Sequence, residues 1–558
     1  MKTTTDLFEA FLKCPTKLWL RAGGEPSSGN TYAEWVKTQG ESYRALESER
    51  TLAETSPNVS ARSPSLEDLK TARWRFGVDV DVVAQASALP RSSRSQEVVS
   101  PAAQPSAINS QPTSQSLVTL AATDQGGASE PGFGVETRLH AVERVPSEGR
   151  GKAAQFIPIR FIFRNKLTKD DRLLLAFDAF VLSAALGRAI ATGKITHGEG
   201  CGCARDSAAI FDEPAAGKQT GRTTAALSRA QPRVTKVKTS ALAGEVRKRL
   251  DKIAALLSSP APPDLVLNRH CAECEFQARC RKIAVEKDDL SLLAGMSAKE
   301  RQKLRSKGIF TVTQLSYTFR PRRRPKRLRD KREKYHHSLK ALAIREKKIH
   351  IVGSPELKIE GTPVYLDVEG LPDRDFYYLI GLRIGNGDSA VQHSLWADTV
   401  EDEGKIWREF LAILETVEKP VLIFYGSYEI TFLRQMREQY SKTTRHDEPP
   451  ETTETTKCNV NLLSTIFAQL YFPTFSNGLK EIGWHLNCAW SDSNPSGCNT
   501  IAWRSRWEAT GDQTLRQYLI QYNTEDCLAL EQVTHCLQVL SKGGSSNPES
   551  VVLVPQQA

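Results

Sequence analysis

Residues 363–370 read P-V-Y-L-D-V-E-G and decide the fold prediction, because they place two acids within an otherwise apolar run. Strand periodicity gives such a run two faces, since successive side chains point in opposite directions. One face carries Val364, Leu366 and Val368, and the other carries Tyr365, Asp367 and Glu369. Two neighbouring carboxylates on a buried face are unfavourable unless a divalent cation lies between them. We therefore interpret Asp367 and Glu369 as metal ligands, and an edge strand with an exposed acidic face is the alternative.

The sequence that follows predicts a mixed sheet covered by helices. Residues 376–384 and 390–396 predict two strands, and the Gly-Asn-Gly-Asp sequence between them favours a hairpin. An amphipathic helix at 403–417 and a buried strand at 420–425 come next. This order of hairpin strands, helix, strand and further helices indicates an α/β domain, which we place at residues 350–541.

Two further acids occur where such a sheet would need them. Glu429 comes shortly after the strand at 420–425, and Asp526 lies in a predicted helix, four residues after Tyr522. The i, i+4 spacing places Tyr522 and Asp526 on one face of that helix. We expect both acids to lie near the strand that carries Asp367.

These motifs resemble those of the DnaQ-like 3′-5′ exonucleases of the DEDD type, most closely the YprB ribonuclease H-like group, over residues 360–541. The pair Asp367-x-Glu369 matches the first motif, and Tyr522-x-x-x-Asp526 matches the third motif in its tyrosine form. The resemblance implies a ribonuclease H-like mixed sheet flanked by helices and a 3′-5′ exonuclease activity.

The second motif departs from the family pattern. Asn-x-x-x-Phe-Asp is usual, whereas residues 425–429 read Tyr-Gly-Ser-Tyr-Glu, so that Glu429 takes the place of the aspartate. A glutamate is one methylene longer than an aspartate, which lets it reach a cation from a shifted position.

The resemblance also implies a mechanism, in which two divalent cations about 4 Å apart hydrolyse a phosphodiester bond. The implied ligands are Asp367, Glu369, Glu429 and Asp526, with Asp367 bridging both ions. Because every ligand atom is an oxygen, Mg²⁺ or Mn²⁺ is the expected metal. Tyr522 would orient the attacking water or help to deprotonate it, and a tyrosine that satisfies a hydrogen bond in the core is the alternative.

Four cysteines predict a second metal site in the N-terminal half. Cys271, Cys274 and Cys280 follow a C-x2-C-x5-C spacing, which is common to zinc sites and iron–sulfur clusters. The fourth ligand would be Cys14, from a predicted helix at 7–19, whereas His270 is adjacent but sterically awkward.

This cysteine pattern resembles that of RecB-like nucleases with an iron–sulfur staple, including CRISPR-associated ones, over residues 1–285. The resemblance implies a restriction-endonuclease-type α/β domain that is closed by a [4Fe–4S] cluster held by all four cysteines. Zn²⁺ is the alternative cofactor.

The catalytic part of the RecB-like resemblance fails. The family carries a histidine where this chain has Tyr43, and its Glu-x-Lys motif is replaced by Arg160 and Ile162. An arginine in the place of a carboxylate would repel a metal ion. The acids that remain are Asp79, Asp81 and Glu148, the last paired with Lys152. We interpret this domain as a degenerate nuclease that binds nucleic acid.

The remaining segments complete the predicted organisation. Residues 84–131 are rich in Ser, Gln, Ala and Pro and predict a disordered insertion in the first domain. Residues 286–319 predict a helix-hairpin-like connector, 320–349 a basic linker, and 542–558 a tail. The linker side chains predicted to contact phosphates without reading sequence are Arg320, Arg322, Arg323, Arg324, Lys326 and Arg327. A solvated, mobile linker is the alternative.

Composition favours a nucleic-acid partner. The chain has 558 residues, a net charge of +10 and 11 cysteines, and it has no apolar run long enough to span a bilayer and no signal-peptide pattern. We therefore expect a cytoplasmic protein with reduced or metal-bound cysteines and no membrane partner. The sequence leaves open whether the substrate is DNA or RNA, and a helicase or a repair or defence protein is a candidate partner that it does not resolve. A nucleic-acid-binding Fe–S or zinc scaffold without nuclease activity is the alternative function.

Overall fold

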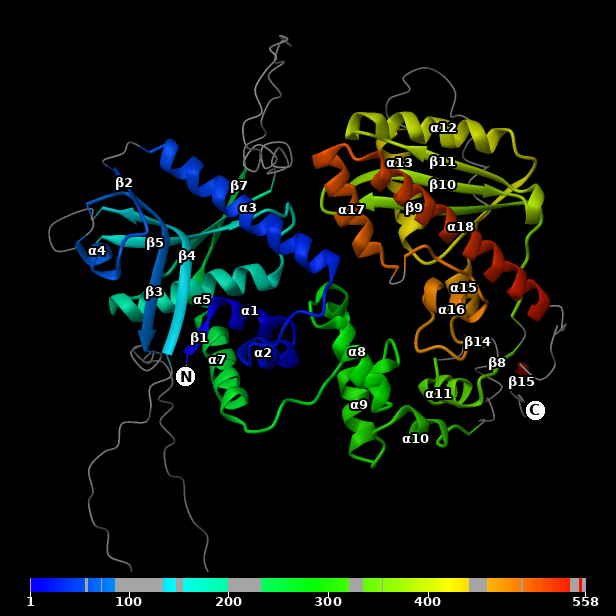
Figure 1. Ribbon diagram of the computed structural model, residues 1–558, viewed down its shortest axis with the longest axis horizontal. Coiled ribbons are helices and arrows are strands. Elements are labelled where there is room, and N and C mark those ends of the chain that lie inside the picture. The colour runs from blue at the N-terminus through cyan, green and yellow to red at the C-terminus, as the bar shows by residue number, and fades with distance from the viewer. Residues whose placement is uncertain are drawn as a thin grey trace, which may run out of the picture.

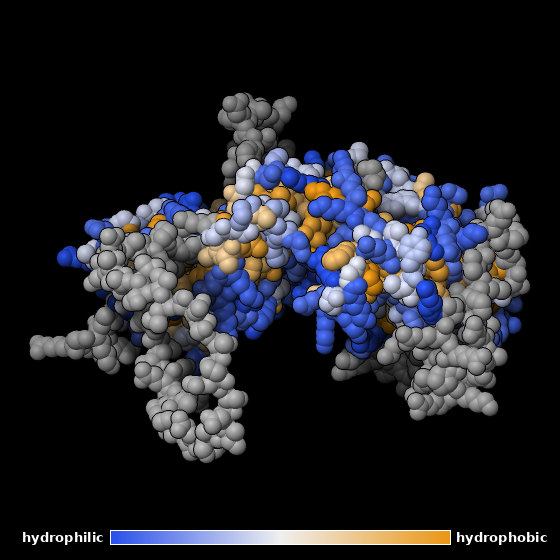
Figure 2. Space-filling model, turned by 90° about the horizontal axis from the view of Figure 1, so that it is seen from below, coloured by the Kyte–Doolittle hydropathy of each residue, from blue (hydrophilic) through white to orange (hydrophobic). Residues whose placement is uncertain are grey.

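The computed structural model describes residues 2–55, 59–71, 73–85, 134–146, 154–198, 232–320, 335–353, 355–440, 459–492 and 495–541, and the backbone of 551–553. Two α/β units, each built on its own sheet, are joined by a group of short helices (Figure 1). The view of Figure 2 shows a mostly hydrophilic surface on which apolar residues gather toward the middle of the molecule. Among the described residues, no helix is both long and apolar enough to cross a membrane.

The N-terminal unit contains a seven-stranded sheet in the order β2-β3-β4-β5-β6-β7, with β1 parallel to β4. Its strands are β1 (Lys2–Thr4), β2 (Ser60–Arg62), β3 (Phe76–Gln85), β4 (Gly134–Val145), β5 (Gln155–Ile162), β6 (Gly193–His197) and β7 (Arg233–Val237). β3, β4 and β5 form an antiparallel meander, and β6 runs parallel to β5. β3 extends to Gln85, two residues into the predicted insertion, and residues 86–133 lie outside the described residues.

Helices cover both faces of this sheet. Tyr43 of α3 (Thr31–Ala53) packs with Val78 and Ile159 on one face. The other face packs against the helices α1 (Thr5–Lys13), α4 (Leu66–Thr71), α5 (Lys169–Leu186) and α7 (Ala243–Ser258). α5 begins at a capping box between Thr168 and Asp171, as its polar start followed by an apolar run predicts.

The start of the chain differs from the prediction of one helix over residues 7–19. The chain forms α1 and then α2 (Pro15–Ala22), with Cys14 between them in an extended conformation, φ −165°. Proline lacks a backbone N–H and fits the first turn of a helix, so that Pro15 starts a new helix instead of continuing the first. The break leaves Cys14 in the bend between the two helices.

The C-terminal unit contains a five-stranded mixed sheet in the order β11-β10-β9-β12-β13. Its strands are β9 (Thr362–Leu371), β10 (Phe376–Ile384), β11 (Val391–Trp396), β12 (Pro420–Phe424) and β13 (Asn459–Asn461). β10 is antiparallel to β9 and β11, whereas β12 is parallel to β9 and β13. The predicted strand at 363–370, the hairpin and the buried strand at 420–425 are therefore confirmed, and β9 lies in the middle of the sheet.

Helices cover both faces of β9, and Asp367 and Glu369 on one of these faces are half-buried. Val364, Leu366 and Val368 pack against α12 (Glu403–Glu415) and α13 (Tyr428–Tyr440). Tyr365, on the opposite face, packs against α15 (Leu462–Ile466), α16 (Leu479–His485) and α18 (Gln513–Ser541). α17 (Gly497–Thr510) lies beside α18. The acids of β9 thus point to the side of the sheet that α18 covers.

A group of short helices connects the two units. They are α8 (Gln277–Glu286), α9 (Ala298–Arg305), α10 (Val312–Ser316) and α11 (His337–Glu346). Ser297 and Thr311 accept hydrogen bonds as the N-caps of α9 and α10. The helices share one apolar core, to which Phe475 of the C-terminal unit also contributes.

A small third sheet has the order β14-β8-β15, formed by β14 (Leu470–Tyr471), β8 (Ile349–Ile351) and β15 (Val551–Leu553). β15 lies in the segment predicted as a tail, yet it pairs in parallel with β8. The end of the chain therefore returns to the start of the C-terminal unit.

Candidate active site

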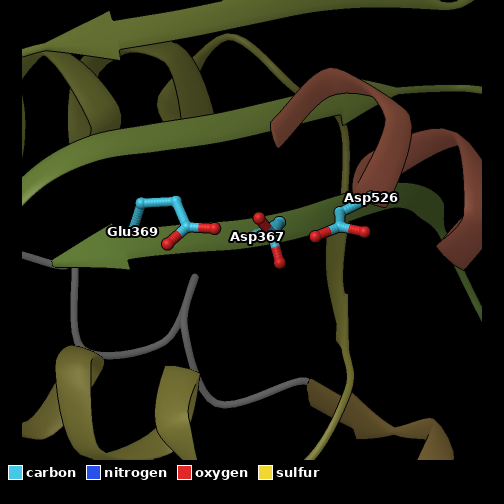
Figure 3. A group of neighbouring side chains, drawn as sticks. All are labelled: Asp367, Glu369 and Asp526. Atoms are coloured by element: carbon cyan, nitrogen blue, oxygen red, sulfur yellow. The ribbon is translucent and has the colours of Figure 1, made fainter. Parts of the chain in front are cut away.

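Three carboxylates meet between the sheet and α18. One oxygen from each of Asp367, Glu369 and Asp526 lies within 4.8 Å of the others. Figure 3 shows the two β9 acids in a row with Asp526, which projects from α18, and Asp367 lies between its two partners. Because all the candidate ligand atoms are carboxylate oxygens, the group suits a hard divalent cation such as Mg²⁺ or Mn²⁺.

Burial makes the negative charge of these acids unfavourable in the absence of a cation. The pKa of Asp367 is raised well above its ordinary value, first by burial and then by repulsion from Asp526 and Glu369. The pKa of Glu369 is raised to about 8 by burial and by Asp526. Strongly shifted acids that face one another are typical of catalytic and metal-binding sites.

Glu429 lies in the first turn of α13, directly after β12, and its side chain faces the same acids. Its pKa is raised to about 8, mainly by burial and then by the charge of Asp367. Its Oε2 atom is buried and has no hydrogen-bond partner among the described residues. A buried carboxylate oxygen without a partner is unfavourable, and a cation bound there would satisfy it.

Tyr522 lies one turn before Asp526 on α18, as the i, i+4 spacing predicts. Its hydroxyl group is buried and has no hydrogen-bond partner among the described residues. The alternative of a tyrosine that satisfies a core hydrogen bond is therefore not what this structure contains. Burial and the charge of Asp526 raise the pKa of Tyr522, which favours the neutral phenol. A neutral phenol acts by donating or accepting a hydrogen bond rather than by carrying a negative charge.

Four further side chains hold the acids in place, and sequence reasoning missed their role. Asn523 donates to Asp367 at 2.7 Å, and Thr500 of α17 donates to Glu369 at 2.8 Å. Asp526 accepts from Trp490 Nε1 at 2.8 Å and also pairs with Lys480. Of these four, Asn523 could have been predicted from the sequence, because it lies three residues before Asp526 and so shares its helix face.

The comparison with protein families bears on this domain. Residues 364–538 match the family model of the RNase H superfamily. The matched region contains Asp367, Glu369, Glu429, Tyr522 and Asp526. The C-terminal unit is a ribonuclease H-like domain, as the acidic motifs predict. A search of curated proteins finds no match to the chain.

The N-terminal unit contacts the ribonuclease H-like domain next to its acids. The loop between β9 and β10 provides Asp373, whose carboxylate accepts from the backbone N–H of Asn165 at 2.8 Å, and Asp375, which pairs with Lys166 at 2.8 Å. α3 of the N-terminal unit also packs against α17, the helix that carries Thr500. The rim of the acidic site is thus formed partly against the N-terminal unit.

The four predicted cysteine ligands come together, although more than 250 residues separate Cys14 from its partners in the sequence. All four line one cavity between α2 and α8: Cys14, Cys271, Cys274 and Cys280. His270 lines the same cavity. Burial raises the pKa of the thiols of Cys271, Cys274 and Cys280, the last to about 11. A bound metal would reverse this shift, because thiolates are the ligand form.

The RecB-like acids do not form a comparable site. Arg160, in the place of the family's metal-binding carboxylate, donates two hydrogen bonds to Asp178, each of 2.9 Å, and both residues are buried. Asp79 instead pairs with Arg44 at 2.5 Å. Among the described residues, no group that could hold a metal ion includes an acid of this unit. Glu148 and Lys152 lie outside the described residues.

Tyr43, in the place of the family's histidine, is a core residue. Its side chain is buried against Val78, and its hydroxyl donates to the carbonyl of Gly198 at 3.2 Å. Of the predicted phosphate-contacting side chains, only Arg320 is described. It donates to the carbonyl groups of Tyr317 and Phe319 at 2.9 and 2.8 Å. The others lie outside the described residues, namely Arg322, Arg323, Arg324, Lys326 and Arg327.

Proposed function

We propose that this chain is a metal-dependent nuclease that removes nucleotides from a 3′ end at the site in its ribonuclease H-like domain. The observation that carries the proposal is the cluster of Asp367, Glu369 and Asp526, which stand within 4.8 Å of one another on buried elements. Glu429 faces the cluster with an unpaired oxygen. Three carboxylates this close together, with a fourth facing them, serve no packing purpose, whereas they suit bound divalent cations.

The chain's own residues would divide the work as follows. Two divalent cations bound by the four acids would generate the attacking water and stabilise the leaving oxygen. Asp367, as the middle acid, Glu369, Glu429 and Asp526 are the residues that would hold the cations. Asn523 and Thr500 fix the orientation of Asp367 and Glu369 through their hydrogen bonds. The free Tyr522 hydroxyl would orient the water.

The N-terminal unit is proposed as a RecB-like domain that binds nucleic acid without cutting it. Its helix, antiparallel meander, helix and parallel strand support the expected α/β fold. Arg160 takes the place of a metal-binding carboxylate of the family, and its guanidinium is paired with Asp178. A divalent cation would have to displace a buried two-point ion pair to bind there.

A [4Fe–4S] cluster is proposed for the four cysteines. One tetrahedral Zn²⁺ would hold its cysteine sulfurs about 3.8 Å apart, given Zn–S bonds of about 2.3 Å. No three cysteine sulfurs of the described residues lie within 4.8 Å of one another, although all four line the same cavity. The support for a cluster over a single zinc ion is the match of the four cysteines to the RecB-like pattern together with their place in one cavity.

The test is degradation of labelled single- and double-stranded DNA and RNA by the full chain, with Mg²⁺, with Mn²⁺ and with EDTA. Asp367→Asn removes one charge and little volume, so we expect it to abolish degradation and to leave the fold intact. A substrate blocked at its 3′ end should resist degradation, whereas one blocked at its 5′ end should not.

The matched control is the double change Asp79→Asn and Asp81→Asn in the N-terminal unit, which should leave degradation unchanged. Degradation that survives Asp367→Asn and disappears with the control would assign the chemistry to the other unit. Binding without degradation under every metal condition would instead support the scaffold function.

A further inference from the structure

A lysine stands inside the acidic site. Lys480 of α16 pairs with Asp526, and its ammonium group lies 4.7 Å from the centre of the Tyr522 ring. It also lies 5.9 Å from the centre of the Trp490 ring. The side chain is 24% exposed, whereas that of Asp526 is 3% exposed, so Lys480 is the partner of the pair that solvent reaches.

Once cations are bound, the ammonium group of Lys480 is no longer needed to neutralise the acids. The four acids carry four negative charges when ionised, and two divalent cations would balance them. Lys480 would then be surplus, and the site would carry one net positive charge. A phosphodiester group carries one negative charge, so the loaded site is complementary to one phosphate of a nucleic-acid strand.

Both oxygens of Asp526 face protein donors, so a cation bound there would share each oxygen with a donor or displace one. One oxygen accepts from Trp490 Nε1 at 2.8 Å, and the other pairs with Lys480. The Trp490 ring is held against Trp484, with ring centres 5.8 Å apart. Lys480 is the donor that can move, because its ammonium group is a point charge on a flexible four-carbon stem.

An exposed aromatic side chain lies one turn further along the same helix. Trp484 follows Lys480 by four residues, so the two share a face of α16. Trp484 is 45% exposed, although it is a large apolar residue next to a buried acidic site. Aromatic side chains beside a phosphate-binding group are typical of sites that stack the bases of an unpaired strand.

We propose that Lys480 and Trp484 form the substrate-strand site of the ribonuclease H-like domain, and that its substrate class is single-stranded nucleic acid. Lys480 exchanges Asp526 for a phosphate of the strand when divalent cations are bound, and Trp484 stacks a base beside that phosphate. The inference rests on the proposed nuclease function, because it assumes that the four acids hold cations. Beyond the nuclease function, the inference names the residues that bind the strand and states that the substrate is single-stranded.

The test measures binding of fluorescent single- and double-stranded oligonucleotides to the full chain in Ca²⁺, which takes the same oxygen ligands as Mg²⁺. We expect Lys480→Gln to weaken single-strand binding about tenfold, because a charge-assisted contact is lost, and Lys480→Arg to retain most of it. We expect Trp484→Ala to weaken single-strand binding about tenfold with little change for the duplex, and Trp484→Phe to retain most of it. Lys405→Gln, on the exposed face of α12, is the charge-matched control.

A second readout separates this role from that of a structural counter-ion. If Lys480 only neutralises Asp526, Lys480→Gln should lower the melting temperature in EDTA and leave single-strand affinity in Ca²⁺ unchanged. That result, or wild-type binding by Trp484→Ala, would overturn the proposal. The nuclease function would still stand if Asp367→Asn abolished degradation, so the two proposals fail independently.

Discussion

The side-chain amide of Asn523 donates hydrogen bonds to both the carboxylate and the main-chain carbonyl of Asp367, at 2.7 and 3.1 Å. This double contact depends on Gly381, which lies opposite Asp367 in the register of β9 and β10. A Cβ atom at Gly381 would stand 1.9 Å from Asn523 Oδ1. A glycine in the centre of a strand lets another group approach closely, and here that group fixes the middle acid of the site.

Gly381→Ala is therefore expected to displace Asn523 and to disturb catalysis at a distance from the reacting atoms. Misplacement of a catalytic group by about 1 Å can lower the rate by about 100-fold, so we expect kcat to fall by about 10- to 100-fold. Binding of the nucleic acid should change little. Gly244→Ala in α7 is the control, because a Cβ there meets no atom within 4 Å. Full activity of Gly381→Ala would show that the Asn523 contact is dispensable.

Substitutions at Glu429 test whether the unusual second motif supplies a metal ligand. Glu429→Gln keeps the length of the side chain and removes its charge. Loss of a residue that only hydrogen-bonds to a metal ligand lowers activity roughly 10- to 100-fold. We expect Glu429→Gln to lower activity by more than that, because it removes a ligand itself. Glu429→Asp restores the acid that is usual in this motif and should retain measurable activity. Steady-state degradation rates at saturating Mg²⁺ provide the comparison. Equal activity of the two variants would remove Glu429 from the ligand set.

The raised pKa values predict how the metal-free protein responds to pH. Glu369 and Glu429 have folded-state pKa values of about 8, above the ordinary value of 4.5, so the folded chain holds protons that the unfolded chain releases. Their contribution to stability is complete below about pH 4.5 and is lost as pH rises toward 8. In EDTA, the melting temperature should therefore fall between pH 6 and pH 8. Mg²⁺ should raise it more at pH 8 than at pH 6, because fewer protons must leave.

Calorimetry in buffers of different ionisation enthalpy would count those protons, and Glu429→Gln should release fewer of them than the wild type. A melting temperature in EDTA that does not fall over this range would contradict the assigned shifts. So would a stabilisation by Mg²⁺ that is equal at the two pH values.

The acids of the site were predictable because each belongs to a local pattern. The two-residue period of a strand places Asp367 beside Glu369, and the i, i+4 spacing of a helix pairs Tyr522 with Asp526. The side chains that hold them follow no such pattern. Thr500 lies 131 residues from Glu369 in the sequence, and it reaches that acid only because α17 packs beside α18. Contacts of this kind are set by tertiary packing and leave no periodic signal.

In the N-terminal unit, the sequence predicted which cysteines would meet but not how. The prediction of one helix over residues 7–19 was wrong, because Pro15 separates α1 from α2 and leaves Cys14 in the bend. Proline at the first position of a helix is itself a sequence signal. The ion pair of Arg160 with Asp178 was harder to predict from the sequence. Asp178 lies in the middle of an apolar helix and contacts Arg160 only because α5 packs on the sheet.

Cys14→Ser tests the second metal site most directly, because Cys14 is separated from its proposed co-ligands by the whole N-terminal sheet unit. The four cysteines line one cavity, so loss of one ligand should prevent stable binding of a [4Fe–4S] cluster. Protein purified without oxygen should be brown, with absorbance near 400 nm in the wild type, and Cys14→Ser should lose both the colour and the iron. Because binding free energy at such a site is also folding free energy, the melting temperature of the variant should fall.

The control is Cys488→Ser, which lies in the ribonuclease H-like domain and should keep its iron. Full iron content in Cys14→Ser would remove Cys14 from the ligand set, and a colourless wild type that holds one zinc ion would replace the cluster with the alternative cofactor.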